Sequence, residues 1–229
     1  MNYRLYTTWG FKIFINADES SMMKDRTTQS YEVCKFQWLI NNLNPEDVFV
    51  DVGANKGDFT LLAASRCKHV YSIEPHPDNL YWLRKSVSAN EFTNISIIEG
   101  CACDFTGKVS LKIGEKSGYH SIVREFPSHI MVSSFQLDNI LPQKVPIVMK
   151  IDVEGAESLV LKGCENTLKY IRSILIDVDG GDVQKIENQL SNYSVVHREG
   201  NERFFTQNIA VQCGCKHNPD SSHPMEKYA

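Results

Sequence analysis

Alternating strand and helix patterns along this 229-residue chain predict an α/β fold with a mostly parallel sheet and helices on both faces. Segments with the helical spacing of apolar residues separate the strands, and a glycine-containing turn directly follows the first of them. The predicted strands are short apolar, β-branched runs at 48–50, 69–73, 95–98, 147–151 and 173–178.

The remaining elements follow in chain order. Residues 3–16 mix aromatic and β-branched residues around Gly10, which indicates a short hairpin. The sequence thus predicts a hairpin and lid extension at 1–30, one domain at 31–212, and a flexible polar tail at 213–229. Helices are predicted at 31–42, 59–67, 78–90, 156–169 and 182–191, and further strands at 109–113, 133–137, 194–197 and 203–211. The short link between the last two strands makes one of them antiparallel.

Composition narrows the classes of function. The chain has a net charge of −4, and its acidic and basic residues are interspersed, so we expect no broad basic face of the kind that binds nucleic acids. No apolar run is long enough for a membrane span, and the N-terminus lacks the apolar core of a secretory signal. Seven cysteines, an odd number, do not indicate a disulfide framework. We therefore expect a cytoplasmic protein without a transmembrane segment, and a homodimer is left open.

The segment DVGANKG at 51–57 joins the first buried-type strand to a helix. Gly53 and Gly57 permit a tight turn and close approach of the backbone to a ligand. Their spacing differs from the G-x-G-x-x-G of dinucleotide-binding proteins, and the carboxylate of Asp51 suits a cationic ligand better than a diphosphate. A tight turn without any ligand is the alternative.

Two further segments follow the next strands. Glu74 and Pro75 end the second strand, where a carboxylate can accept hydrogen bonds from both ribose hydroxyls. Cys101 and Ala102 lie in a loop after the third strand, and their small side chains would leave room for a nucleobase. The alternatives are that Glu74 is a solvated residue at a strand end and that Cys101 and Ala102 lie in a loop that binds no ligand.

The segment KIDVEGAE at 150–157 carries three carboxylates at the end of a central strand. Ligands of open α/β sheets bind at that edge. Glu157 could simply favour the first turn of a helix, and Asp152 could be a helix cap. Because the carboxylates are crowded, we interpret the segment as part of a binding site.

Three segments resemble the FkbM family of S-adenosylmethionine-dependent methyltransferases over about residues 30–180: FVDVGANKGDFTLLAA, VYSIEPHP and VMKIDVEGAESLVLKG. The resemblance implies a Rossmann-like class I methyltransferase fold. Its seven-stranded sheet has the order 3-2-1-4-5-7-6, with strand 7 antiparallel. The chain departs from many relatives at Asp177-Val178-Asp179, where they carry a glutamate, and at Lys56 and Asp58.

The resemblance also implies roles for the residues in these segments. Asp51, Gly53, Asn55 and Gly57 would cradle the methionine part of S-adenosylmethionine, Glu74 beside Pro75 would hold the ribose, Cys101 and Ala102 would border the adenine, and Asp152 would lie near the transferred methyl group. The implied reaction is O-methylation of a sugar, glycolipid or secondary metabolite, with S-adenosylhomocysteine as product. The acceptor is thus a small molecule, glycan or lipid.

A hydroxyl acceptor must lose a proton, so a base is needed. The candidates are Asp152, Glu154, Asp177 and His120, although the sequence favours a surface histidine at position 120 over a catalytic one. A metal bound by Asp152, Asp177 and Asp179 is an alternative source of acidity, while the tail residues Cys213, Cys215, His217 and His223 fit no standard zinc spacing. No metal ligand is assigned. Two other functions stay open: a non-catalytic S-adenosylmethionine-binding module and a nucleotide-dependent oxidoreductase.

Overall fold

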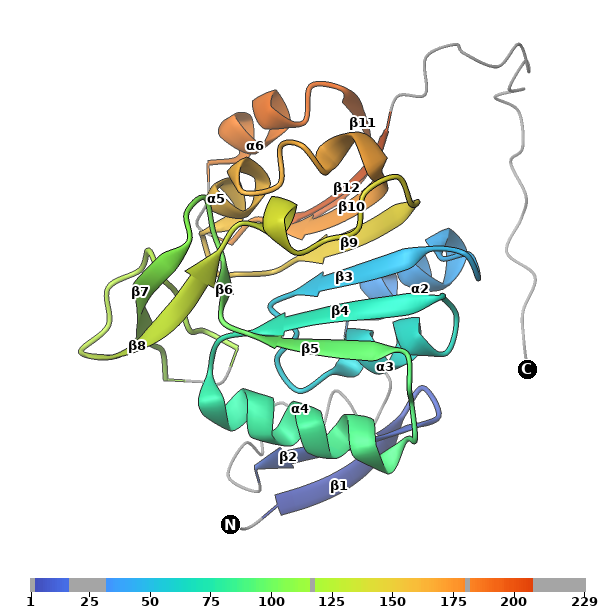
Figure 1. The fold of residues 1–229 in the computed structure, drawn as a ribbon, viewed down its shortest axis with the longest axis vertical. Helices are drawn as coiled ribbons and strands as arrows, with labels where there is room; N and C mark the ends of the chain where they lie inside the picture. Colours follow the sequence, from blue (N-terminus) through green and yellow to red (C-terminus); the bar gives the residue numbers. More distant parts are fainter. Residues whose placement is uncertain (1–2, 17–31, 116–117, 180–181, 208–229) are drawn as a thin grey trace.

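A computed structural model describes residues 3–16, 32–115, 118–179 and 182–207 of the chain (Figure 1). Its centre is a seven-stranded sheet with the order β5-β4-β3-β9-β10-β12-β11. Counted along the chain these strands are third, second, first, fourth, fifth, seventh and sixth, and β12 is antiparallel to both its neighbours. The predicted fold class is therefore confirmed. The strands are β3 (Val48–Val52), β4 (His69–Glu74), β5 (Ile95–Glu99), β9 (Ile147–Ile151), β10 (Ile171–Asp177), β11 (Tyr193–Glu199) and β12 (Glu202–Gln207).

The two central strands are apolar on both sides because both faces of the sheet are covered. Every residue of β3 and β9 is buried. Their polar exceptions are Asp51 and Lys150, which lie opposite each other in the parallel pairing of β3 with β9. The sequence places a carboxylate and an ammonium side by side at the centre of an otherwise apolar sheet.

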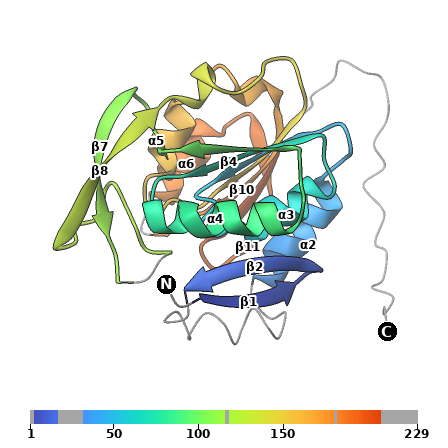
Figure 2. The same ribbon diagram turned by 60° about the horizontal axis from the view of Figure 1, so that its bottom comes forward.

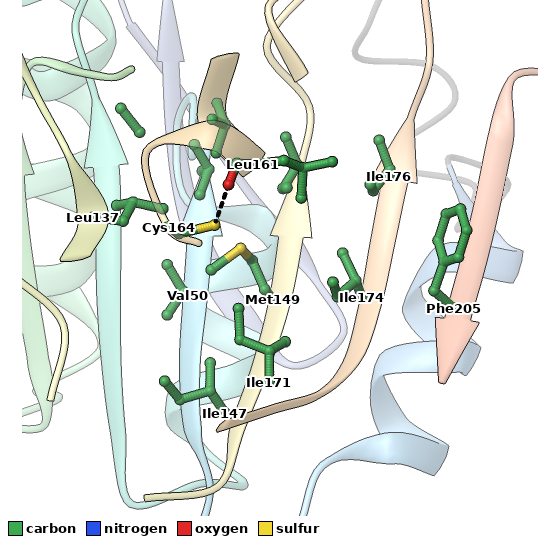
Figure 3. Close-up of a cluster of buried hydrophobic side chains, with 14 of the residues drawn as sticks. Val50, Leu137, Ile147, Met149, Leu161, Cys164, Ile171, Ile174, Ile176 and Phe205 are labelled. Carbon is green, nitrogen blue, oxygen red and sulfur yellow. Dashed lines mark hydrogen bonds between the residues drawn. The ribbon is translucent and has the colours of Figure 1, made fainter. Parts of the chain in front are cut away.

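Helices form a layer on each face of the sheet (Figure 2). On one face lie α2 (Val33–Asn42), α3 (Asp58–Ala64) and α4 (Pro77–Ala89), and Phe36 and Phe59 pack there against Phe49. The other face carries α5 (Glu157–Lys162) and α6 (Val183–Gln189). Figure 3 shows the core of this second face, where Leu161 and Cys164 cover Val50, Met149 and Ile174.

The predicted N-terminal hairpin is present as β1 (Tyr3–Thr8) and β2 (Phe11–Asn16). It packs on α3 and α4, with Ile13 and Ile15 against Leu61 (Figure 2). Its backbone is tied to α4 by hydrogen bonds of Ser86 and Asn90. The rest of the predicted lid, residues 17–30, lies outside the described residues.

Two expectations are corrected. The predicted helix 156–169 ends at Lys162, because Gly163 packs against the Cys103 carbonyl and the chain turns away into η2 (Leu168–Tyr170). The predicted strands 109–113 and 133–137 lie outside the main sheet. They belong to a small separate sheet in which β8 (Ser128–Phe135) pairs with both β7 (Gly107–Ile113) and β6 (Cys101–Ala102). A one-turn helix η1 (Leu137–Asn139) follows β8.

The structure describes only part of the predicted C-terminal strand and none of the predicted tail. The last described strand ends at Gln207, so residues 208–211 of the predicted strand and the predicted tail 213–229 lie outside the described residues. Within the described segments, no helix combines the length and the apolar character needed to cross a membrane.

Candidate active site

A cavity of about 320 Å³ opens at the carboxyl ends of β3, β4, β9 and β10. Parallel strands of an open α/β sheet bind their ligands at this edge. The predicted residues that line the cavity are Gly53, Asn55, Glu74, Pro75, Cys101, Ala102, His120, Asp152, Glu154 and Asp177. Asp51 and Gly57 are not among the lining residues, although both belong to the same segment of sequence.

The glycine turn after β3 is packed against both neighbouring strands. The backbone amides of Gly53 and Ala54 donate to the Ile73 carbonyl, at 3.0 and 2.9 Å. Gly53 has a φ of +81°, and a Cβ added there would lie 1.9 Å from the Asp152 carbonyl oxygen. Gly57 has a φ of +96°, and its Cβ would meet the Leu83 side chain of α4. Gly53 therefore allows the cavity wall to pack against the Asp152 backbone, while Gly57 allows the start of α3 to pack against α4.

Asp51 lies behind the wall, where its side chain is fully buried. The Thr60 hydroxyl donates to Asp51 Oδ2 at 2.6 Å, and Lys150 Nζ lies 3.5 Å from Asp51 Oδ1. Burial raises the pKa of Asp51, and Lys150 and Thr60 oppose this rise. The carboxylate is thus placed to hold Lys150, and it does not face the cavity as the predicted cofactor contact would require.

Lys150 lines the cavity and links the two strand ends. Its ammonium lies 3.4 Å from Asp152 Oδ2 and donates to the Gly53 carbonyl at 3.2 Å. Burial opposes the charge of Lys150, but the carboxylates of Asp152 and Asp51 outweigh it and raise the pKa. Lys150 is a functional candidate that the sequence motifs do not single out. Its one signal in the sequence is a lysine within an apolar strand, since a buried ammonium requires a partner.

Glu74 is the buried carboxylate at the end of β4. Its Oε2 accepts from the Asn55 amide at 2.8 Å, and its Oε1 accepts from the His76 amide at 2.9 Å and from Asn79 Nδ2 at 3.2 Å. Burial raises the pKa of Glu74 to about 7, although these three donors lower it. Asn55 adopts a φ of +52° so that its amide reaches this carboxylate. Glu74, at the end of β4, therefore holds in place the glycine turn that follows β3.

The two carboxylates after β9 differ in ionisation. Burial opposes ionisation of Asp152, but Lys150 and Lys35 outweigh it and hold the pKa below its usual value. Burial and the nearby Asp152 raise the pKa of Glu154 to about 8, although Arg124 lies 2.8 Å away. At neutral pH Asp152 is ionised while Glu154 is mostly protonated. Glu154 also has a φ of +57°, a strained conformation typical of functional sites.

The segment 118–124 contributes Gly118, Tyr119, His120 and Ile122 to the lining of the cavity and is anchored at two points. The Ser121 hydroxyl donates to the Glu154 carbonyl at 2.7 Å, and Arg124 pairs with Glu154 and Asp179. His120 lines the cavity and stacks on His76, with 4.1 Å between the ring centroids. Burial lowers the pKa of His120 to about 4, with a further contribution from His76. His120 is therefore a neutral, half-buried residue of the cavity.

The far end of the cavity is lined by Glu32, Asp177, Asp179 and Asn201. Sequence reasoning found only Asp177 and Asp179, because Glu32 and Asn201 come from distant parts of the chain. It also missed Lys35, whose ammonium lies 2.7 Å from Asp177 Oδ2 and 2.8 Å from Glu32 Oε1. Lys35 lies on the buried side of α2, a position where helical spacing alone predicts an apolar residue.

These pairings bear on the metal alternative. Asp177 is bound to Lys35 and Asp179 to Arg124, so protein cations already hold both carboxylates. In the described segments, no three or more His, Cys, Asp or Glu side chains gather as metal ligands would. The four tail residues that contain zinc-type donors lie outside those segments.

Solved structures share the fold. An FkbM methyltransferase from Methylobacillus flagellatus aligns over 72% of this chain and 44% of its own, at 20% identity and a TM-score of 0.53. TYW2 from Methanocaldococcus jannaschii, solved in complex with AdoMet, aligns over 90% of this chain and 87% of its own, at 11% identity and a TM-score of 0.52. A putative methyltransferase from Streptococcus mutans, in complex with SAH, aligns over 76% of this chain and 96% of its own, at 11% identity and a TM-score of 0.51.

Sequence comparison gives the family. The hexuronic acid methyltransferase AglP of Haloferax volcanii is 28% identical over 155 residues, which is 65% of this chain and 64% of AglP. The chain therefore spans a little under two thirds of the length of this relative. The model of the methyltransferase FkbM domain matches residues 51–199, a range that contains the glycine turn, Glu74 and the Asp152 segment. This chain belongs to the FkbM methyltransferase-domain family.

Proposed function

We propose that this protein transfers a methyl group from S-adenosylmethionine to a hydroxyl group of an acceptor bound in the same cavity. One observation carries the proposal. The buried Glu74 carboxylate, the glycine turn that it holds and the ionised Asp152 all face one cavity at the carboxyl edge of the sheet. The same cavity therefore combines an end suited to a nucleoside, at Glu74, with an end that carries an ionised carboxylate, at Asp152.

The residues present fit S-adenosylmethionine. Two carboxylate oxygens offer about four acceptor positions, and three protein donors occupy Glu74, so one position is left for a ribose hydroxyl. Cys101 and Ala102 contribute small side chains to the wall beside Glu74. The carboxylate of Asp152 suits a cofactor that carries a sulfonium and an ammonium group.

The carboxylate of Asp152 is the proposed base. When bound, S-adenosylmethionine supplies an electrophilic methyl group, and the protein supplies orientation and electrostatics. Asp152 is ionised because of its two lysine neighbours, so it can accept the proton of an acceptor hydroxyl. Glu154, mostly protonated at neutral pH, is better suited to donate a hydrogen bond to the acceptor. His120 is neutral and can accept one.

The proposed acceptor is a hydroxyl of a sugar, free or within a glycolipid. AglP, which carries hexuronic acid in its name, supports a sugar ring as the acceptor. The carboxylates that line this cavity favour a neutral sugar over the acidic sugar of that name, because they suit hydroxyl groups. A non-catalytic S-adenosylmethionine-binding module is the second candidate, since a cavity by itself shows binding and not turnover.

Titration calorimetry and a transfer assay test these proposals in order. We expect the protein to bind S-adenosylmethionine and S-adenosylhomocysteine, and not NAD. Transfer of labelled methyl groups to a panel of sugars and glycolipids would then separate an enzyme from a binding module. Binding of NAD in place of S-adenosylmethionine would overturn the proposed cofactor, and binding without transfer to any acceptor would favour the module.

We expect the affinity for S-adenosylhomocysteine to fall as the pH drops below about 7. Glu74 has a pKa of about 7 in the free protein, and its ionised form is the stronger acceptor because protonation turns one oxygen into an O–H donor. Ligand hydroxyls should therefore lower that pKa, and the dissociation constant should rise by up to about tenfold per pH unit below 7. Calorimetry from about pH 5.5 to about pH 8, a range on either side of the Glu74 pKa of about 7, measures the dissociation constant.

Two variants test whether Glu74 itself causes this pH dependence of binding. Glu74→Gln should bind more weakly at pH 8, about one unit above the pKa, and should lose most of the pH dependence. Glu157→Gln is the matched control, because burial also raises the pKa of Glu157 to about 7 but its side chain does not line the cavity. An unchanged pH dependence in Glu74→Gln would contradict the role of Glu74.

The stability of the free protein should change with pH in the opposite direction. The folded-state pKa of Glu74, about 7, lies above its ordinary value of 4.5, so the folded chain binds more protons than the unfolded chain between these values. The contribution of Glu74 to stability is thus present below pH 4.5 and is lost as the pH rises through about 7.

A further inference from the structure

Lys35 is a buried ammonium behind the cavity wall, beside Glu32 and Asp177, and the proposed chemistry uses it only through its effect on the pKa of Asp152. It is 2% exposed and lies between three elements that are distant in sequence. Its Nζ is 2.8 Å from Glu32 Oε1 at the start of α2, 2.7 Å from Asp177 Oδ2 at the end of β10, and 3.4 Å from Glu202 Oε1 at the start of β12. One lysine therefore joins the helix and both strands.

Burial alone would favour a neutral Lys35. The carboxylates of Glu32, Asp152 and Asp177 outweigh that effect and raise its pKa, so the ammonium stays charged. In return, Lys35 lowers the pKa of Asp152, together with Lys150. Removing one partner of such a buried arrangement leaves uncompensated charge, which is strongly unfavourable. The orientation of Glu32 and Asp177 and the ionisation of Asp152 therefore depend on this side chain.

Two of the three partners of Lys35, Glu32 and Asp177, also line the cavity. Lys35 itself does not, so it can act on an acceptor only through them. We propose that Lys35 is a positioning residue that holds Glu32 and Asp177 as a wall of hydrogen-bond acceptors, and that this wall selects an uncharged polyhydroxyl acceptor over an anionic one. The proposal rests on the proposed function, because it assigns this end of the cavity to the methyl acceptor.

The charges of the wall explain the selectivity. Among the described residues that line the cavity, Lys150 is the only lysine or arginine, and it is already bound to Asp51, Asp152 and the Gly53 carbonyl. A carboxylate on the acceptor would meet Glu32 and Asp177 without a cation of its own. A sugar hydroxyl, in contrast, donates a charge-assisted hydrogen bond to either of them.

The first experiment compares Lys35→Met, Lys35→Arg and Lys162→Met. Methionine keeps the length of the side chain without charge, and arginine restores the charge. Lys162, whose side chain is 60% exposed beside Asp104, is the matched surface control. In Lys35→Met we expect kcat/KM for the acceptor to fall by about tenfold or more and the acidic limb of its pH profile to move up by about one unit. Lys35→Arg should recover most of the activity, and Lys162→Met should behave as wild type.

The second experiment tests the class of acceptor without turnover. The probes are methyl α-D-glucopyranoside and the corresponding methyl glucuronide, added to the wild-type complex with S-adenosylhomocysteine. Saturation-transfer difference NMR should show binding of the glucoside that is about tenfold or more tighter than that of the glucuronide. Equal or tighter binding of the glucuronide, or binding of neither sugar, would overturn the proposed selectivity.

A third measurement separates failure of this inference from failure of the proposed function. The melting temperature of Lys35→Met should lie furthest below that of wild type near neutral pH, and the gap should narrow as the pH falls and the unpaired carboxylates take up protons. A constant gap, or an unchanged kcat/KM in Lys35→Met, would overturn the positioning role. If S-adenosylhomocysteine does not bind the wild-type chain, the proposed function and the acceptor selectivity fail together, while the melting curves still decide whether Lys35 holds the carboxylates.

Discussion

Replacing Asp152 with asparagine is expected to lower the turnover number by about 10²–10⁴-fold, the range of a lost general base. The amide keeps the shape of the side chain but cannot accept a proton from the acceptor. Lys150 keeps the carboxylate of Asp51 as a partner, so the substitution should leave the fold intact. A transfer assay under saturating S-adenosylmethionine measures the loss.

Binding should be affected much less than turnover. The proposed ribose side of the cavity consists of Glu74 and the turn that it holds, and none of the hydrogen bonds of Glu74 involves the Asp152 side chain. We therefore expect the dissociation constant of S-adenosylhomocysteine to change by less than about tenfold, because one charge near the ligand is lost while its remaining contacts stay. Calorimetry of Asp152→Asn gives this value directly.

The matched control is Asp182→Asn at the start of α6. Asp182 is exposed and caps the helix by accepting from the Lys185 amide, a role that asparagine also fills. It should keep wild-type turnover and binding. A wild-type turnover number in Asp152→Asn would rule out Asp152 as the base and would direct attention to Asp177 or His120, which line the same cavity.

Replacing Gly53 with alanine is expected to cause a large loss of stability. The new Cβ would lie 1.9 Å from the Asp152 carbonyl oxygen, which is backbone and cannot rotate away. A left-handed conformation at a residue with a Cβ costs about 1–2 kcal/mol. Forcing apart a well-packed region costs about 1–3 kcal/mol more. The free energy of unfolding should therefore fall by about 2–5 kcal/mol.

Binding of S-adenosylhomocysteine should be lost together with that stability. The clash separates the end of β3 from the end of β9, and both ends line the cavity. Chemical denaturation measures the stability, and calorimetry at low temperature measures the binding of the folded fraction.

Gly10→Ala provides a close control for the backbone conformation. Gly10 has a φ of +86°, against +81° for Gly53, but nothing lies within 4 Å of a Cβ at that position. It should lose only the conformational part, about 1–2 kcal/mol, and should bind S-adenosylhomocysteine as wild type does. Equal losses of stability in the two variants would show that the close approach to Asp152 has no energetic weight.

The residues that line the Glu74 end of the cavity could be predicted because their signals are local in sequence. A tight turn needs glycines within a few residues of a strand, and β4 adds Glu74 at the same edge because parallel strands end together. The position of Asp51 could not be predicted in the same way. Its residue type indicates a charged contact, but whether the side chain faces the cavity or Lys150 depends on the pairing of β3 with β9.

The residues of the proposed acceptor side could be found only in the tertiary structure. Lys35, Glu32 and Glu202 meet only because α2 packs beside β10 and β12. Arg124 reaches Glu154 and Asp179 only because its segment folds back over the strand ends. A buried ion pair between distant residues leaves no periodic pattern, so an isolated lysine on a helix appears as a solvated residue.

The sequence by itself determined the fold class, the strand order through the family resemblance, and the residues around the proposed methyl donor. These features follow from hydrophobic periodicity and from turns that only glycine can form, and both are written in adjacent residues. The tertiary structure alone decided which charges are paired, in which direction burial and neighbouring charges shift the pKa values of the carboxylates, and which residues form the proposed acceptor wall. Those properties depend on burial and on distances of a few ångströms between side chains far apart in the chain, and such distances exist only once the sheet and its helices have packed.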